Sequence, residues 1–261
     1  MNNYHFINTP NLPTGKVSHV IMSDYIPELV QEIQSYGINV LIPDKLSNIE
    51  GAEAYHADMS ICHMNRNKFI VAKNNIGIIN KLKLLNADIV FSSNQICGKY
   101  PSITALNVCI VGNNLICNSK HTDKKILDFC NENNFKILHT NQGYSKCSSA
   151  VISDNALITA DESIYNLCNK NKIDVLKISN SDINLDGYNY GFIGGTCGFI
   201  DKHTLAFSGN IKLHKDYLNI KDFVNNYHID LLSLSNKTLY DIGGILPIME
   251  IFKQHNNIDI V

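Results

Sequence analysis

The sequence predicts an α/β fold of five similar modules around a pseudo-fivefold axis, an α/β propeller that the C-terminal strand closes into a ring. Three observations lead to this prediction. A helix followed by a short apolar strand recurs five times, four of these copies begin with a hairpin, and the first copy lacks a strand that the C-terminus can supply. Internal repeats indicate a repeat architecture. Closing such an array into a ring removes the open ends that a linear array has to cap.

The strand after each helix is the most regular part of the repeat. The helix pattern ends at Gly, Asn or Lys, as at Gly37 and Asn134, which are residues typical of helix ends. The expected strands are 38–41, 87–90, 135–138, 173–176 and 229–232.

A hairpin is expected before the helix in four copies. Turns such as Gly112-Asn113 and Ser153-Asp154 carry the residues that tight hairpin geometry favours. The expected strand pairs are 59–64 with 67–71, 107–111 with 114–116, 149–152 with 155–158, and 197–200 with 203–207. The repeating unit is therefore strand, turn, strand, helix, strand.

The first copy is incomplete. It has a strand at 17–23, a helix near 26–35 and a strand at 38–41, but no strand before them. A spare apolar strand, 241–249, follows the last complete copy. We therefore expect strand 241–249 to pair with the first copy and to close residues 1–261 into a single domain.

A doubly wound open sheet is the alternative, because both folds alternate strands and helices. The paired strands before the helices favour the ring, since a wound sheet alternates its elements singly. Gly194-Gly195 and Gly243-Gly244 are glycine pairs without the Gly-x-Gly-x-x-Gly spacing of a dinucleotide-binding loop.

Composition excludes several classes of partner. The net charge of -2 provides no long-range attraction for nucleic acid or an anionic membrane. The N-terminal residues lack the pattern of a signal peptide, and the apolar runs are too short to span a membrane. We expect a cytoplasmic protein, a monomer or a homodimer, that binds neither nucleic acid nor membranes.

One segment has a family resemblance. Residues 56–71, which read His-Ala-Asp-Met-Ser-Ile-Cys-His-Met-Asn-Arg-Asn-Lys-Phe-Ile-Val, resemble the His-x-Asp strand of arginine deiminases and its following turn. Five modules around an axis resemble the pentein fold of the guanidino-group-modifying enzymes. The chain is also similar to an uncharacterised clostridial-type family (DUF6873) assigned to that superfamily. The resemblance implies that His56 is a general acid/base and that Asp58 helps to hold a guanidinium group.

The resemblance also implies a cysteine nucleophile, whose thiolate would attack the guanidinium carbon. The family places it two modules after the histidine, which implicates Cys147 in a segment that starts at Gly143. Cys197, at another inner strand start, is the competing nucleophile. Asp241, just before Gly243-Gly244, would be a second guanidinium anchor. Family enzymes usually carry the cysteine at the chain end, so this assignment rotates the site around the ring.

Each of these side chains also has a structural interpretation. His56 could cap a turn, and Asp58 could pair with it, because alternate positions of a strand share a face. Cys147 could be a small buried hydrophobe, and Asp241 could belong to a turn. His56 and His63 are an odd number of residues apart and would point to opposite faces of a strand, so we expect no metal. No Cys-x-x-Cys pair occurs among the eight cysteines, and we expect no cofactor.

Two functions remain open on the sequence. The first is an enzyme that acts on a guanidino or amidino small molecule, as a hydrolase or, less favoured, an amidinotransferase. The second is a non-catalytic ring that binds a protein or ribosomal partner. The His-x-Asp segment favours the enzyme, whereas the absence of a cysteine from 241–249 favours the binding protein.

Overall fold

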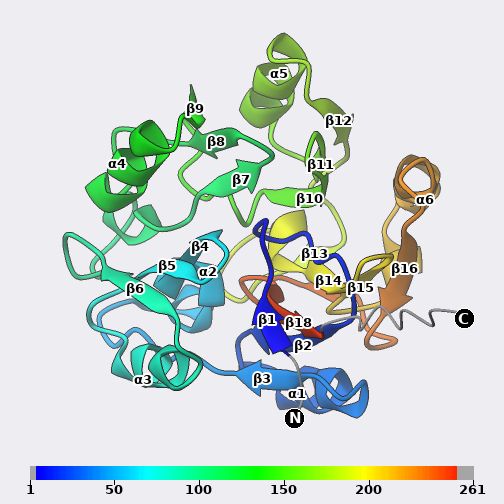
Figure 1. Ribbon diagram of the computed structural model, residues 1–261. Coiled ribbons are helices and arrows are strands. Elements are labelled where there is room, and N and C mark those ends of the chain that lie inside the picture. The colour runs from blue at the N-terminus through cyan, green and yellow to red at the C-terminus, as the bar shows by residue number, and fades with distance from the viewer. Residues whose placement is uncertain (1–3, 252–261) are drawn as a thin grey trace, which may run out of the picture.

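The computed structural model describes residues 4–251 and has a mixed α/β fold (Figure 1). The expected domain of residues 1–261 therefore includes terminal positions outside the described residues. Five sheets of three or four strands, each with a helix packed beside it, lie around a common centre (Figure 1). Within the described part of the chain, no helix is long and apolar enough to cross a membrane.

Four of the sheets share one strand order. In each, two strands form an antiparallel hairpin, and a third strand pairs in parallel with the second after a helical crossover. The sheets are β4 (Ile61–Asn65), β5 (Lys68–Val71) and β6 (Asp88–Phe91); β7 (Cys109–Val111), β8 (Asn114–Cys117) and β9 (Lys136–His139); β10 (Ser149–Ser153), β11 (Ala156–Thr159) and β12 (Asp174–Lys177); and β14 (Cys197–Asp201), β15 (Thr204–Phe207) and β16 (Asp230–Ser233).

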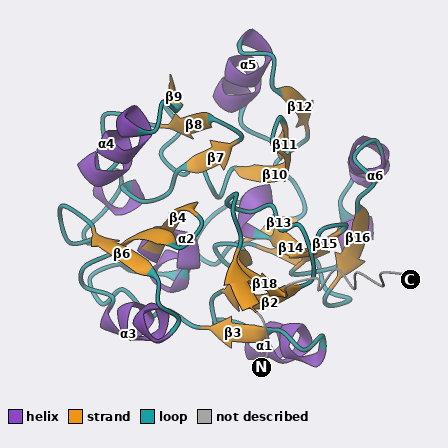
Figure 2. Ribbon diagram, in the orientation of Figure 1, coloured by secondary structure: helices purple, strands orange, loops and turns teal. Residues whose placement is uncertain are grey.

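The crossover helices are alike in length and in the positive-φ residue that follows each of them. Each has nine residues, and Figure 2 shows them at the periphery. They are α1 (Pro27–Ser35), α3 (Ile76–Leu84), α4 (Lys124–Glu132), α5 (Glu162–Lys170) and α6 (Tyr217–Asn225). Asn75, Asp123 and Asp161 cap three of them by accepting a backbone N–H of the first turn. A residue with positive φ follows each helix, as at Gly37 and Asn134, and turns the chain into the next strand.

The first sheet contains both ends of the described chain. Its order is β1 (Tyr4–Phe6), β18 (Leu246–Ile251), β2 (Val17–Ile21) and β3 (Asn39–Leu41). Because β18 pairs antiparallel with β2, the expected pairing of a C-terminal strand with the first copy is present. The strand begins later than predicted, since Gly243 and Gly244 both have positive φ and interrupt the extended backbone.

The His-x-Asp segment is not a strand, and that prediction is wrong. Residues Ala57–Ser60 form a single helical turn, α2, and β4 begins only at Ile61. The backbone N–H of Ile61 donates to the carbonyl of Ala57, which closes the turn. The resemblance to a His-x-Asp strand predicted an extended chain, but this local hydrogen bond makes the segment helical.

Short elements complete the fold between the sheets. They are η1 (Ala52–Tyr55), η2 (Ser102–Thr104), η3 (Ile193–Gly195), η4 (Ile211–Leu213) and the parallel pair β13 (Ile183–Asn184) and β17 (Leu239–Tyr240). The apolar core lies where neighbouring sheets meet their helices. Cys109 and Cys168, for example, are fully buried in one such cluster. All eight cysteines are free thiols, and most have the packing role of small hydrophobes.

A buried carboxylate ties β18 to the N-terminal segment and provides a test of ring closure. Glu250 is fully buried and accepts hydrogen bonds from the backbone N–H groups of Thr14 and Gly15 and from the Thr14 hydroxyl. We expect Glu250→Ala to lower the free energy of unfolding by about 2–3 kcal/mol, because it leaves buried donors without an acceptor. Urea unfolding measures the change.

The matched control is Glu132→Ala on the exposed end of α4, which we expect to change the free energy of unfolding by less than about 0.5 kcal/mol. Equal losses in the two variants would show that Glu250 does not hold the closing strand.

Candidate active site

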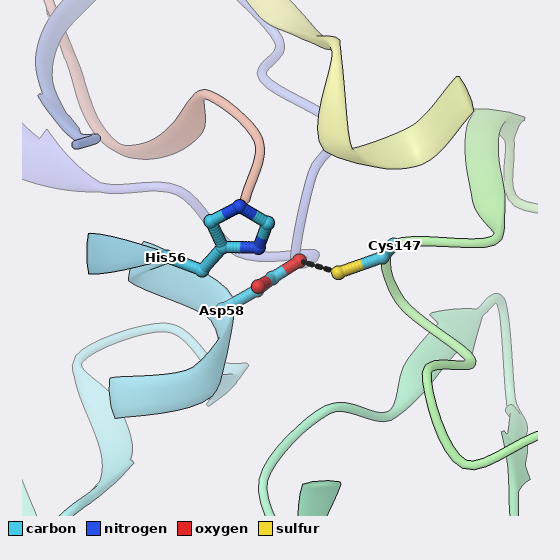
Figure 3. Close-up of side chains that lie close together, drawn as sticks. All are labelled: His56, Asp58 and Cys147. Atoms are coloured by element: carbon cyan, nitrogen blue, oxygen red, sulfur yellow. Dashed lines mark hydrogen bonds between the residues drawn. The ribbon is translucent and has the colours of Figure 1, made fainter. Parts of the chain in front are cut away.

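Side chains from three distant segments meet near the common centre of the sheets. Ligand atoms of His56, Asp58 and Cys147 all lie within 4.8 Å of one another. Figure 3 shows the Cys147 thiol pointing at the Asp58 carboxylate, with the His56 ring beside it. The fourth predicted residue, Asp241, joins them, since its Oδ1 lies 3.8 Å from Nε2 of His56. The structure thus brings together all four residues that the sequence singled out.

The thiol of Cys147 is held from two sides. Sγ donates to Oδ2 of Asp58 at 2.9 Å and accepts from Nδ2 of Asn107 at 3.1 Å. The residue is only 1% exposed and lies in a turn two residues before β10, and not at the strand start that was expected. A cysteine in a turn can be aimed by its neighbours, whereas a strand position would tie its direction to the pleat.

Asn107 positions this turn, although its place in the sequence did not predict such a role. Its Oδ1 accepts the backbone N–H groups of Lys146 and Cys147 at 2.9 and 3.2 Å, while its amide nitrogen contacts the thiol. One buried side chain therefore fixes both the backbone and the sulfur of the candidate nucleophile. The sequence held one signal for it, a polar residue opening the apolar segment 107–111, but nothing local set it apart from a turn residue.

Two glycines let the Asp241 segment approach this centre. Gly243 has a φ of 74°, and a Cβ at that position would lie 2.4 Å from Cβ of His56. A Cβ on Gly195 would lie 1.8 Å from Oδ1 of Asp241. No other residue fits at either position without moving the site apart. One glycine of each pair in the sequence therefore serves close packing.

Asp241 is held by the backbone around it. Its carboxylate accepts the N–H groups of Phe192 at 2.9 Å and Gly243 at 3.1 Å. Burial raises the pKa of Asp241, and the opposing charge of His56 and these backbone donors lower it in part. The residue is thus more than a turn residue, because its side chain organises two segments and faces the site.

Lys146 is a further buried group that the sequence analysis did not select. Its Nζ is 3.4 Å from the carbonyl oxygen of Gly194, and its charge lowers the pKa of both Asp58 and Asp241. When both carboxyl groups are ionised, Asp58, Asp241 and Lys146 together carry one net negative charge. A buried site with that balance is complementary to one cation.

The electrostatics keep Cys147 a thiol in the free protein. Burial raises its pKa well above the usual value, and the negative charges of Asp58 and Asp241 raise it further. Burial also raises the pKa of Asp58, to about 6, against the opposing charges of His56 and Lys146. A cation bound beside the carboxylates would lower the pKa of the thiol and favour the thiolate.

Two atoms of the site have no hydrogen-bond partner among the described residues. They are Nε2 of His56 and Oδ1 of Asp58, and both residues are at least 97% buried. Buried polar atoms without partners destabilise a fold, so such atoms mark places where a ligand or water completes the bonding. They are the groups that a bound guanidinium and its leaving nitrogen would need.

The competing residues lie in different surroundings. Cys197 is at the start of β14, as expected, and its Sγ contacts the carbonyl oxygen of Ile193 at 3.5 Å. Burial raises its pKa to about 12. His63 lies on β4 and its Nε2 is 2.6 Å from the carbonyl oxygen of Arg66. His56, Asp58 and Cys147 are the one group of potential metal ligands in the described part of the chain.

Proteins of known structure share this fold at low sequence identity. SxtG, an amidinotransferase from Microseira wollei, matches with a TM-score of 0.55 and 10% identity, over 88% of this chain and 91% of that one. DDAH from Pseudomonas aeruginosa, a cysteine-to-serine mutant with citrulline, matches with a TM-score of 0.55 and 10% identity, over 91% and 100% of the two chains. Agmatine deiminase from C. jejuni, a cysteine-to-serine form with substrate bound, has a TM-score of 0.53 and 9% identity, over 95% and 96%.

These likenesses show that the chain shares its α/β fold with an amidinotransferase, DDAH and agmatine deiminase. At such low identity they establish the fold alone. By sequence, the chain belongs to the family of unknown function DUF6873, which it matches over residues 20–246. No curated protein matches the sequence.

Reaction of the thiol with a neutral reagent tests the electrostatics of the site. We expect iodoacetamide to label Cys147 slowly, because burial and two carboxylates raise its pKa. Asp58→Asn removes one negative charge and should speed labelling by about tenfold for each unit by which the pKa falls. Mass spectrometry gives the rate relative to the partly exposed Cys97. An unchanged or slower rate in Asp58→Asn would contradict this electrostatic account.

Stability should depend on pH through Asp58. Its pKa is about 6 in the folded protein and is ordinarily 3.8, so the folded state holds its proton more tightly. The resulting stability is present at low pH and is lost as pH rises through about 4 to 6. Asp58→Asn cannot ionise, so relative to wild type it should gain up to about 3 kcal/mol between about pH 4 and pH 7.5. Urea unfolding at both pH values measures this, and an equal difference at both would contradict it.

Proposed function

We propose that this protein is a cysteine-dependent enzyme that acts on a guanidino or amidino small molecule. In this proposal Cys147 is the nucleophile, His56 the acid/base, and Asp58 and Asp241 the anchors of the cation. We also propose that the five sheets form a closed α/β propeller around this site. One observation carries the proposal, namely that the thiol of Cys147 donates to a buried carboxylate beside a histidine whose Nε2 has no hydrogen-bond partner among the described residues, in a fold shared with guanidino-modifying enzymes.

Binding would begin with the carboxylates. A guanidinium group is planar and offers donors in a rigid fork that suits carboxylate oxygens. Oδ1 of Asp58 has no partner among the described residues and is available to accept such a donor. The one net negative charge of Asp58, Asp241 and Lys146 would be balanced by the substrate, which compensates for the loss of its hydration.

Reaction would follow from the change in charge. The bound cation lowers the pKa of Cys147, and the thiol proton passes to the neutral imidazole of His56. The thiolate donates an electron pair to the guanidinium carbon and forms an S–C bond. As the C–N bond breaks, its electron pair stays on the leaving nitrogen, which takes the proton from His56.

The thiouronium intermediate would then be resolved by an acceptor. In a hydrolase, water attacks the same carbon, His56 accepts the proton of the water, and the S–C electron pair returns to sulfur. In an amidinotransferase, an amine takes the place of water. Because His56 and Cys147 lie within 4.8 Å, one histidine is able to serve both half-reactions.

The alternative is a non-catalytic ring that binds a protein or ribosomal partner. Such a protein has no use for two buried carboxylates beside a histidine whose Nε2 has no hydrogen-bond partner among the described residues, because buried charges and unsatisfied polar atoms destabilise the fold. The concentration of these groups therefore supports the enzyme.

An alkylating reagent that resembles the substrate tests the proposal. We expect limiting chloroacetamidine at neutral pH to label Cys147 before the other cysteines, because its amidinium can bind beside the carboxylates. Asp58→Asn should slow this labelling by roughly tenfold or more, since a hydrogen bond to a charged group is lost. Asp58→Asn thus has opposite effects on the charged and the neutral reagent. Peptide mapping by mass spectrometry identifies the labelled residue.

Cys197→Ser is the matched control and should leave the labelling of Cys147 in place. Selective labelling of Cys197 in the wild type would support the same class of enzyme but would identify Cys197, and not Cys147, as the nucleophile. Slow, uniform labelling of several cysteines would mean that no thiol is activated, and would favour the binding protein.

A further inference from the structure

A cleft of about 390 Å³ lies next to the site and has no role in the reaction described above. Its lining includes Glu50, Glu53, Lys99, Tyr100, Tyr144 and Tyr188. Two of these residues connect it to the catalytic groups. Glu53 lies in η1, which leads directly into His56, and Tyr144 lies three residues before Cys147. A molecule whose reacting end sits at Cys147 would therefore have this cleft within reach of its other end.

Glu53 is the unusual residue of the cleft. It is only 6% exposed, and its carboxylate accepts a hydrogen bond of 2.5 Å from the hydroxyl of Tyr188. Burial and the negative charge of Glu53 raise the pKa of Tyr188 to about 12. Among the described residues, no cation forms an ion pair with Glu53. A buried carboxylate whose hydrogen-bond donor is a neutral hydroxyl has its charge uncompensated, and a cation is the partner that it lacks.

Tyr188 can be displaced from Glu53 at small cost. The residue is 50% exposed and lies in the connection between β13 and η3, far in sequence from Glu53. Its hydroxyl can therefore exchange Glu53 for water when another donor arrives. The rings of Tyr100 and Tyr144 lie 5.6 Å apart and provide an aromatic wall, and aromatic faces attract cations.

We propose that this cleft binds a cationic group on the tail of the substrate, with Glu53 as its counter-ion. The inference rests on the proposed function and adds a substrate class to it, namely guanidino compounds with a second positive charge at the far end. The charges of the cleft favour such a tail over an anionic one, because Glu50 and Glu53 face a single cation, Lys99. Glu53 is then a specificity-determining residue that takes no part in the chemistry.

Protection of Cys147 against chloroacetamidine tests the inference without requiring turnover. The protecting compounds are aminobutylguanidine, butylguanidine and guanidinobutyrate, whose tails are cationic, neutral and anionic at similar length. For the wild type, we expect aminobutylguanidine to protect at a concentration roughly tenfold lower than butylguanidine, as one charged hydrogen bond allows. Guanidinobutyrate should protect least.

Variants assign the preference to Glu53. Glu53→Gln should bring the half-protection concentrations of aminobutylguanidine and butylguanidine together, because it removes the charge and keeps the shape. The matched control Glu132→Gln, on exposed α4, should keep the wild-type ratio. Tyr188→Phe removes the competing hydroxyl and should lower the half-protection concentration of aminobutylguanidine while leaving that of butylguanidine unchanged.

The outcomes separate this inference from the proposed function. Equal protection by the three compounds in the wild type, or a cationic preference that persists in Glu53→Gln, would overturn the tail site and leave the enzyme standing. If Glu53→Gln does not fold, the test depends on Tyr188→Phe. An unchanged half-protection concentration of aminobutylguanidine in that variant would overturn the tail site. If Cys147 is not labelled selectively at all, the proposed function fails, and the tail site fails with it.

Discussion

The hydrogen bond between the Cys147 thiol and the Asp58 carboxylate is the contact on which the centre of this molecule depends. It joins residues 89 positions apart, from the segments that lead into β4 and β10. Asn107, which lies just before β7, contacts the same sulfur and the backbone that carries it. Three units thus converge on one buried atom. The polar side chains that meet here lie in the segments just before the strands and not in the strands themselves.

Concentrating charge at this point opposes stability. Desolvation raises the pKa of Asp58, Asp241 and Cys147 together, and Lys146 compensates for one of the two carboxylates. The apolar clusters between neighbouring sheets have to stabilise the fold against this cost. Most of the fold buries apolar side chains, whereas this centre buries charged ones. Such a local exception is typical of a functional site.

The site and the adjoining cleft share one connection. Asp241 accepts the backbone N–H of Phe192, and the same connection between β13 and η3 carries Tyr188 to Glu53. The group that would anchor the guanidinium therefore also holds the segment that covers the proposed tail site.

The sequence by itself determined the elements, because strands, turns and helix ends depend on neighbouring residues. Each strand that follows a helix begins one residue later than predicted. The first of these strands, for example, begins at Asn39, because Ile38 before it packs in the core. The resemblance also selected His56, Asp58, Cys147 and Asp241, which do meet. Only the tertiary structure decided the rest. Three features depend on partners far along the chain, about which the local sequence pattern carries no information. They are the contacts of Asn107 with the Cys147 turn, the burial of Lys146 against Gly194, and the hydrogen bond between Glu53 and Tyr188.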